Sequence, residues 1–292
     1  MNKIYYKQLE KIIRKNLDQR SMDGIELEGE LEAAAASLLK GETILIVTGF
    51  VIRDAMAGET DGPVGAVSLA GALEQLGKKV ILITDEYSES LLDSCRKVKG
   101  LTCPIEVISS GSESLFCRSL MKKYNPTHVI AIERPGRAEG GCCYSMKGED
   151  ISDIVPNTDI LFEEAKKQGA ATIAVGDGGN EVGMGKISSY IIEALYNGEK
   201  ICAAFAADFL IIAGVSNWGG HALAAALSIL TGSMLLHGTE TEEKLLESIV
   251  TAGAVDGCTK KRTMTVDGLS LEDNLNILDL LRETIEAAIK RP

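Results

Sequence analysis

Aromatic and basic residues are both scarce in this chain. Phe, Trp and Tyr make up 4% of its 292 residues, and 30 Lys and Arg stand against 42 Asp and Glu, a formal net charge of −12 at pH 7. Few rings are available to stack on nucleobases, and an acidic surface repels nucleic acid and anionic lipid. We therefore expect no nucleic-acid or membrane partner. A small acidic substrate would have to be bound by a local set of donors.

Paired cysteines and long apolar runs are also missing. The seven cysteines are an odd number, and no two have CxxC spacing, which favours free thiols in a reducing compartment. The neighbours Cys142 and Cys143 present too few ligands for a metal, so we interpret them as buried or incidental thiols. No apolar run approaches the roughly 20 residues that span a bilayer, and no charged-then-apolar leader opens the chain. We expect a cytoplasmic protein whose oligomeric state is open, a homo-oligomer included.

Six short apolar runs alternate with helical patterns. The runs are Thr43–Val47, Val80–Thr84, Ile105–Ile108, His128–Ile132, Thr172–Val175 and Phe209–Ile212. Such alternation predicts an α/β fold, a mostly parallel sheet with helices on both faces. From Thr241 onward the pattern predicts a helical C-terminal extension, apart from the turn-rich Asp256–Leu269. No repeat, linker or composition break is present, so we expect residues 1–292 to form a single α/β domain.

A glycine-rich run follows the fifth expected strand. Residues 176–186 read Gly-Asp-Gly-Gly-Asn-Glu-Val-Gly-Met-Gly-Lys. Glycine permits close backbone approach, so the amides of Gly178 and Gly179 could surround an anionic substrate. Asp177, Asn180 and Glu181 supply the hard oxygen ligands that Mg²⁺ or Mn²⁺ prefers. The alternative is a tight turn that caps the next helix. A Walker loop is excluded, because no Lys-Ser or Lys-Thr closes the required spacing.

Acidic residues also follow the first expected strand. Glu59 and Asp61 precede Gly62-Pro63 and a helical pattern. Taken alone, Asp61 is a typical helix cap with proline in the first turn. However, the carboxyl ends of parallel strands meet at one edge of a sheet. We therefore expect one divalent-cation site formed by Glu59, Asp61, Asp177, Asn180 and Glu181.

Two further strand ends carry polar side chains. Arg134 and Arg137 follow the fourth strand, and arginine pairs bind carboxylate or phosphate in bidentate fashion, although surface arginines usually form only solvated ion pairs. Ser216 and Asn217 follow the sixth strand, where we interpret them as substrate-binding or amide-capping groups. All of these loops should converge on one rim of the sheet.

Four motifs together resemble the D-glutamate cyclase-like family. They are Glu59-Thr-Asp-Gly-Pro-Val-Gly-Ala66, Glu133-Arg-Pro-Gly-Arg-Ala138, the glycine run 176–186 and Gly214-Val-Ser-Asn-Trp-Gly-Gly220. The resemblance extends from about Thr43 to Leu230. It implies interconversion of D-glutamate and 5-oxo-D-proline, with loss or addition of water, and binding of a divalent metal. The chain departs from the family pattern at residues 140–144, where Asp-Gly and paired tyrosines are expected, and at Lys147, where arginine is expected.

The reaction implied by this resemblance needs three kinds of group. The γ-carboxylate must be neutralised by a metal or an arginine, and a carboxylate must move protons. We expect Arg134 and Arg137 to hold the α-carboxylate. Proton transfer and metal binding fall to Asp177, Glu181, Glu59 and Asp61, in a division that the sequence leaves open. Two other functions fit the same residues: a metal-dependent phosphohydrolase acting on a small phosphate ester, and a non-catalytic sensor of an acidic metabolite.

Overall fold

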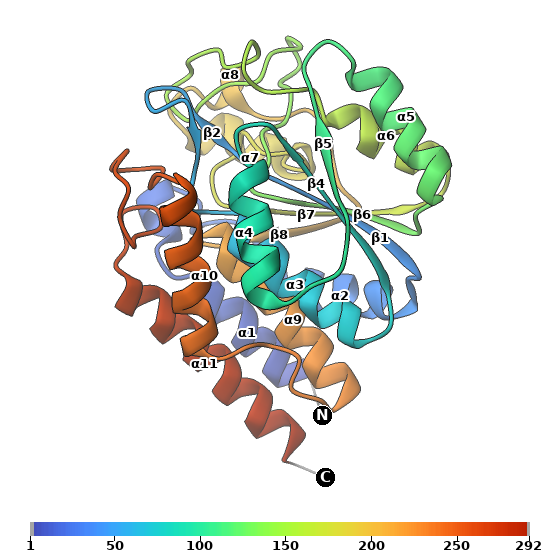
Figure 1. Cartoon of the computed structure of the whole chain (residues 1–292). Helices are drawn as coiled ribbons and strands as arrows, with labels where there is room; N and C mark the ends of the chain where they lie inside the picture. The colour runs from blue at the N-terminus through green and yellow to red at the C-terminus, as the bar shows by residue number, and fades with distance from the viewer. Residues whose placement is uncertain (1–2, 291–292) are drawn as a thin grey trace.

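Six parallel strands form the central sheet of the protein (Figure 1). The structure is a computed structural model that describes residues 3–290. The strands are β1 (Thr43–Thr48), β4 (Lys79–Asp85), β5 (Ile105–Ile108), β6 (His128–Ile132), β7 (Ala171–Gly176) and β8 (Phe209–Ile212). They lie in the order β5-β4-β1-β6-β7-β8, and every neighbouring pair is parallel. The predicted fold class and all six predicted strands are confirmed.

The direction of strand addition reverses between β1 and β6. The chain first adds β4 and β5 on one side of β1, then crosses to add β6, β7 and β8 on the other. The loops that leave the two central strands therefore diverge. Such a divergence opens a crevice at the carboxyl ends of the strands, which is the usual ligand position in open α/β sheets.

Both faces of the sheet are buried because its strands are mostly apolar, and the four central strands are buried along nearly their whole length. Ile44 and Ile46 of β1 face one core, whereas Leu45 and Val47 face the other. The first core is covered by α1 (Lys3–Ile13), α2 (Glu30–Lys40), α3 (Pro63–Gln75), α4 (Glu89–Lys99), α9 (Ser216–Thr231), α10 (Thr239–Ala252) and α11 (Leu271–Ile289). The second is covered by α5 (Glu113–Tyr124), α6 (Asp159–Lys167), α7 (Ser188–Ala194) and α8 (Gly198–Ile201). Helices α10 and α11 confirm the predicted helical extension.

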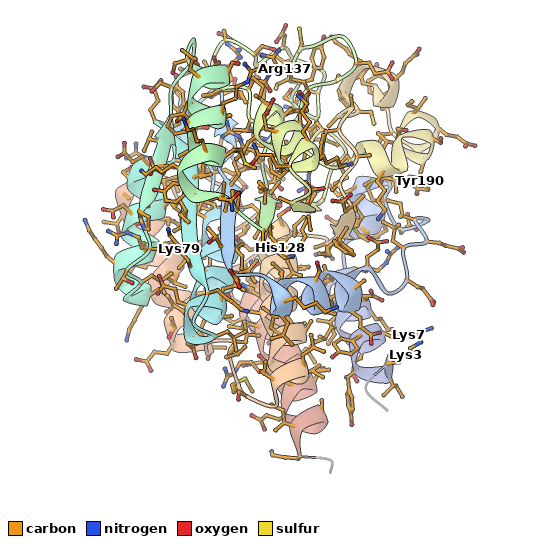
Figure 2. The ribbon with its side chains drawn as sticks, turned by 90° about the vertical axis from the view of Figure 1, so that its right-hand side faces the viewer. Lys3, Lys7, Lys79, His128, Arg137 and Tyr190 are labelled. Atoms are coloured by element: carbon orange, nitrogen blue, oxygen red, sulfur yellow. The ribbon has the colours of Figure 1, made fainter. Side chains whose placement is uncertain are left out.

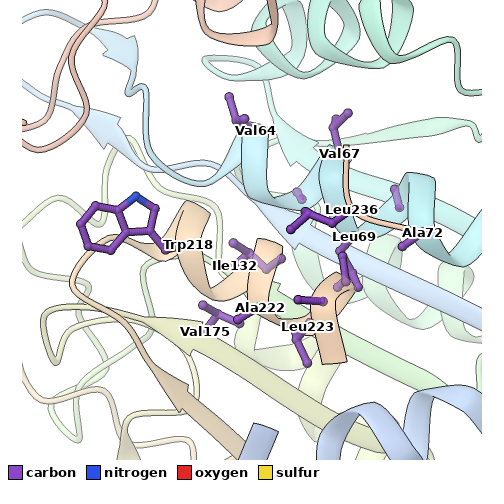
Figure 3. Close-up of a cluster of buried hydrophobic side chains, with 14 of the residues drawn as sticks. Val64, Val67, Leu69, Ala72, Ile132, Val175, Trp218, Ala222, Leu223 and Leu236 are labelled. Atoms are coloured by element: carbon purple, nitrogen blue, oxygen red, sulfur yellow. The ribbon is translucent and has the colours of Figure 1, made fainter. Parts of the chain in front are cut away.

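Helices α3 and α9 cross where two glycines meet. A Cβ atom on Gly220 would lie 2.6 Å from the carbonyl oxygen of Gly65, a distance that no side chain tolerates. Apolar side chains, among them Val64 and Ala222, fill the space around the crossing (Figure 3). This close approach holds the N-termini of the two helices together at the rim of the sheet.

A short hairpin lies between β1 and α3. Its strands are β2 (Val51–Ile52) and β3 (Ala57–Gly58), which are too short to show any period in the sequence and were not predicted. Arg53 in the hairpin pairs with Asp153 and Glu149 and so ties it to the loop after β6. Within residues 3–290, no helix combines the length and apolar character that crossing a bilayer requires.

Candidate active site

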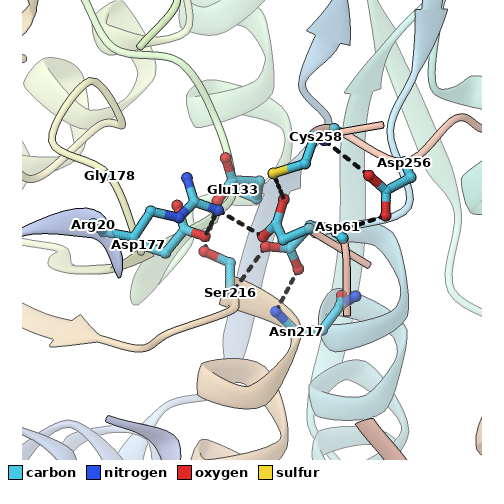
Figure 4. Close-up of polar contacts among 12 residues, drawn as sticks. Arg20, Asp61, Glu133, Asp177, Gly178, Ser216, Asn217, Asp256 and Cys258 are labelled. Carbon is cyan, nitrogen blue, oxygen red and sulfur yellow. Dashed lines mark hydrogen bonds and ion pairs between the residues drawn. The ribbon is translucent and has the colours of Figure 1, made fainter. Parts of the chain in front are cut away.

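A cavity of about 310 Å³ lies at the carboxyl ends of the central strands. Residues after β1, β6 and β7 line it, together with the turn that precedes α2 and the loop between α10 and α11. Besides Glu181, four acidic side chains of the lining are buried or nearly buried, and the buried Asp61 lies beside two of them. We call these five the central carboxylates: Glu59, Asp61, Glu133, Asp177 and Asp267. Figure 4 shows several of them converging.

Four of the central carboxylates, together with Glu181, form two groups that share Asp177. Oxygen atoms of Asp61, Asp177 and Asp267 all lie within 4.8 Å of one another, and so do oxygen atoms of Glu133, Asp177 and Glu181. The structure thus brings together residues that follow β1, β6 and β7, as the strand-end argument predicted. Glu59 and Asn180 line the same cavity.

Burial makes the ionised form of these carboxyls unfavourable. Desolvation raises the pKa of Glu59, Asp61, Glu133 and Asp177 well above the ordinary value. Repulsion between neighbouring carboxylates adds to the rise in pKa, while Arg20 opposes it at Asp177. Crowded carboxylates in a dry site favour a proton or a cation beside them.

The donor set fits a hard divalent cation. The ligand atoms in these two groups are all carboxylate oxygens, which suit Mg²⁺ or Mn²⁺ and do not suit a soft metal. Asp61 and Glu181 are already engaged by backbone amides, whereas the Asp177 carboxylate accepts a hydrogen bond from Arg20 and from no other residue among 3–290. Asp177 and Asp267 therefore retain more free lone pairs for a cation than Asp61 and Glu181 do.

The glycine loop binds a carboxylate of its own. Glu181 accepts hydrogen bonds from the backbone N–H groups of Asp177, Gly178 and Gly179 at 3.1, 2.7 and 2.6 Å. These are the amides that we expected to surround a substrate anion. The structure does not leave the amides of Gly178 and Gly179 free for that purpose, because both already donate to the Glu181 side chain.

The N-terminus of α9 is capped by Asp61. Its carboxylate accepts hydrogen bonds from the backbone of Ser216 and Asn217 at 2.8 and 2.7 Å. The Asn217 side chain accepts from the backbone N–H groups of Gly62 and Gly65, so it has the amide-capping role of the two that we considered. The Ser216 hydroxyl instead donates to Glu133 Oε2 at 2.6 Å.

Glu133 has a backbone conformation that residues other than glycine rarely adopt. Its φ is 46°, and a Cβ on Gly62 would lie 2.8 Å from the Cβ of Glu133. Strain of this kind costs on the order of 1–3 kcal/mol and is concentrated at functional sites. The strained turn directs Glu133 into the cavity, although the sequence pattern did not single this residue out.

Arg134 and Arg137 lie away from the cavity. Arg134 is fully buried, pairs with Asp85 and donates to the carbonyl oxygens of Gly49 and Pro156. Arg137 lies past the carboxyl end of β6 (Figure 2) and does not line the cavity. The expectation that both bind the substrate meets a physical obstacle: Arg134 is held in the interior by Asp85, and Arg137 is not part of the cavity lining.

Two central residues besides Glu133 were missed by the sequence analysis. Arg20 ends the 3₁₀ turn η1 (Leu17–Arg20), and its Nη2 lies 2.7 Å from Asp177 Oδ2 and 2.9 Å from Asp267 Oδ2 (Figure 4). These two carboxylates raise the pKa of Arg20. Neither Arg20 nor Asp267 follows a strand, so the strand-end pattern gave no signal for them.

Comparisons with known proteins agree with the motifs. The family model described as D-glutamate cyclase-like, C-terminal, matches residues 9–282. The chain belongs to this D-glutamate cyclase-like family. Human D-glutamate cyclase, mitochondrial, is 37% identical over 238 residues, which are 77% of this chain and 39% of the human protein. An exopolyphosphatase-related protein from Bacteroides fragilis aligns with 92% of this chain and 62% of its own, at a TM-score of 0.45 and 10% identity, a likeness too remote to carry an argument.

This member of the D-glutamate cyclase-like family has its unusual segment beside the cavity. The carbonyl oxygen of Tyr144 accepts a hydrogen bond from the Asn180 side chain at 2.7 Å, and Lys147 lines the cavity. Cys143 is buried, and burial raises the pKa of its thiol to about 12. A thiol with so high a pKa is unreactive at neutral pH, which agrees with our interpretation of Cys143 as a buried thiol.

Proposed function

We propose that this chain interconverts D-glutamate and 5-oxo-D-proline, with loss or addition of water and with assistance from Mg²⁺ or Mn²⁺. The observation that carries the proposal is the set of buried carboxyls with raised pKa around one cavity. Family membership supports it, because the human relative is named a D-glutamate cyclase. The compartment is part of the proposal too: we keep the cytoplasmic expectation, although that relative is mitochondrial.

Ring closure joins the amine of D-glutamate to its γ-carboxyl carbon. The amine loses a proton as the C–N bond forms, and the departing hydroxyl leaves as water after it gains one. The reverse reaction adds water to the lactam carbonyl. A divalent cation held by Asp177 and Asp267, with Asp61 or Glu133 beside them, would neutralise the γ-carboxylate and polarise its carbonyl.

Two glutamates are placed to move the protons. Glu133 accepts a hydrogen bond from the Ser216 hydroxyl, which partly offsets the rise in its pKa that burial and neighbouring carboxylates cause, so we assign it the role of base. Glu59 accepts no hydrogen bond from any residue among 3–290, and burial together with Asp267 and Asp61 raises its pKa. We therefore assign Glu59 the role of the acid that protonates the departing hydroxyl.

The test is an activity panel with the purified protein. D-glutamate, L-glutamate and several phosphate esters are incubated with Mg²⁺, with Mn²⁺ and with a chelator, and products are followed by chiral chromatography and phosphate release. We expect 5-oxo-D-proline from D-glutamate in the presence of metal. Phosphate release without any 5-oxoproline would favour the phosphohydrolase function, and binding without turnover would favour the sensor.

A further inference from the structure

One guanidinium contacts the central carboxylates. In the part of the chain that the structure describes, Arg20 is the arginine that pairs with them, through Asp177 and Asp267. Arg134 is paired with Asp85, and Arg53 pairs with Glu149 and Asp153 at the rim. The guanidinium that contacts the central carboxylates therefore comes from the N-terminal segment and not from the loop after β6.

The backbone around Arg20 is built to hold this side chain in place. Asn16 and Ser21, on either side of the turn, both have left-handed conformations, with φ of 69° and 56°. Leu17 and Met22 are buried in the core and anchor the two ends of the turn. The Tyr190 hydroxyl donates to the carbonyl oxygen of Ser21 at 3.0 Å. A strained, anchored turn is what a fixed functional side chain requires.

The guanidinium has donors to spare. Both ion pairs of Arg20 use Nη2, and no acceptor among residues 3–290 takes a hydrogen bond from its Nε or Nη1. The side chain is 21% exposed and lines the cavity. A guanidinium carries five N–H groups in a planar fork that matches a carboxylate. Its unused N–H groups are therefore available to an anion in the cavity.

Charge favours such a group. A substrate with a carboxylate that enters this cavity meets several buried carboxyls, and any of them that is ionised repels it, so a fixed cation beside them favours binding. Arg20 already holds its charge in place through Asp177 and Asp267, so little rearrangement is needed on binding. We propose that Arg20 binds the α-carboxylate of the substrate, the role that the strand-end pattern suggested for Arg134 and Arg137. The identity of the anion rests on the proposed function.

The test compares two ligands that differ in one group. 5-oxo-D-proline carries the carboxylate, and 2-pyrrolidinone is the same ring without it. Calorimetry measures the binding of each, with metal present, to the wild type, Arg20→Lys and Arg20→Gln. Arg118→Lys, on the exposed side of α5, is the matched control, and thermal unfolding checks that each variant is folded.

We expect the wild type to prefer 5-oxo-D-proline and Arg20→Gln to lose about ten- to a hundredfold in affinity for it, as for a lost charged hydrogen bond. Affinity for 2-pyrrolidinone should change little. The affinity of Arg20→Lys for 5-oxo-D-proline should lie between those of the wild type and Arg20→Gln. Unchanged preference in Arg20→Gln, or no binding by the wild type, would overturn the assignment. Binding that depends on Arg20 without any turnover would leave it standing and contradict the proposed reaction instead.

Discussion

Asp177 belongs to both groups of acidic oxygens and also contacts Arg20. The change Asp177→Asn nearly preserves shape but removes the charge. We expect turnover to fall about a hundredfold or more, in line with the loss of metal or acid–base assistance, while the fold persists. Steady-state kinetics and thermal unfolding measure the two effects. If Asp177 only forms a turn, asparagine should support similar turnover, and that result would count against the site.

The positions of the candidate site residues were predictable only in part. Glu59, Asp61 and Asp177 were found because each follows a strand of a parallel sheet, and such ends converge. The sequence did not show which side chains of the protein itself would occupy the groups expected to bind substrate. Glu181 accepts hydrogen bonds from the glycine-loop amides, and Asp85 forms an ion pair with Arg134. These pairings depend on which way each side chain faces once the backbone is folded.

At the scale of elements, the α3–α9 crossing positions the N-termini of two helices beside the candidate active site. Gly220→Ala would push a methyl group against the Gly65 backbone, which cannot move aside cheaply. We expect unfolding free energy to fall by about 2 kcal/mol, as for overpacking in general. Urea unfolding measures the change. The matched control is Gly140→Ala, since that position has nothing within 4 Å, and an equal effect at both positions would refute the crossing as the cause.

A buried cluster of hydrogen-bonded side chains joins α9 to α10. Glu242 accepts hydrogen bonds from His221 and His237 at 3.1 and 2.6 Å, all three being buried. Burial lowers the pKa of His237 to about 4. Although burial alone would raise the pKa of Glu242, the two histidines outweigh it and lower that pKa. Ser68 of α3 and Lys99 of α4 also face this cluster.

Acid should therefore destabilise the fold through this cluster. In the unfolded chain His237 has a pKa of about 6.5, whereas in the folded protein its pKa is about 4. Between these two pH values the unfolded chain binds a proton at His237 and the folded protein does not, so the free energy of unfolding falls as the pH is lowered from 6.5 to about 4. We expect His237→Gln to reduce that loss by up to about 3 kcal/mol. Urea unfolding at several pH values measures it. The central carboxylates titrate in both the wild type and His237→Gln, so their contribution cancels when the two are compared. Parallel curves of unfolding free energy against pH for the two proteins would disprove this role of His237.

Strands could be predicted from the sequence where they form a run of buried apolar residues. The six strands are recognisable because both of their faces are apolar. The β2–β3 hairpin was missed because each of its strands has two residues, too few to carry a period.

At the scale of the whole molecule, the site is assembled from segments far apart in the sequence. The turn at Arg20 and the loop at Asp267 reach the ends of β1, β6 and β7. Their meeting point depends on how α1 and α11 pack on the first core, which no local pattern encodes. The sheet could be predicted from the sequence, but the two segments that complete its candidate active site could not.

The most direct test of the central claim follows oxygen from water into product. 5-oxo-D-proline is incubated with the wild-type protein and Mg²⁺ or Mn²⁺ in water labelled with heavy oxygen, and D-glutamate is isolated early by chiral chromatography and analysed by mass spectrometry. The account predicts D-glutamate with one labelled oxygen in its γ-carboxylate and none in its α-carboxylate. Absence of D-glutamate from a folded, metal-supplied protein, or D-glutamate without the label, would contradict it.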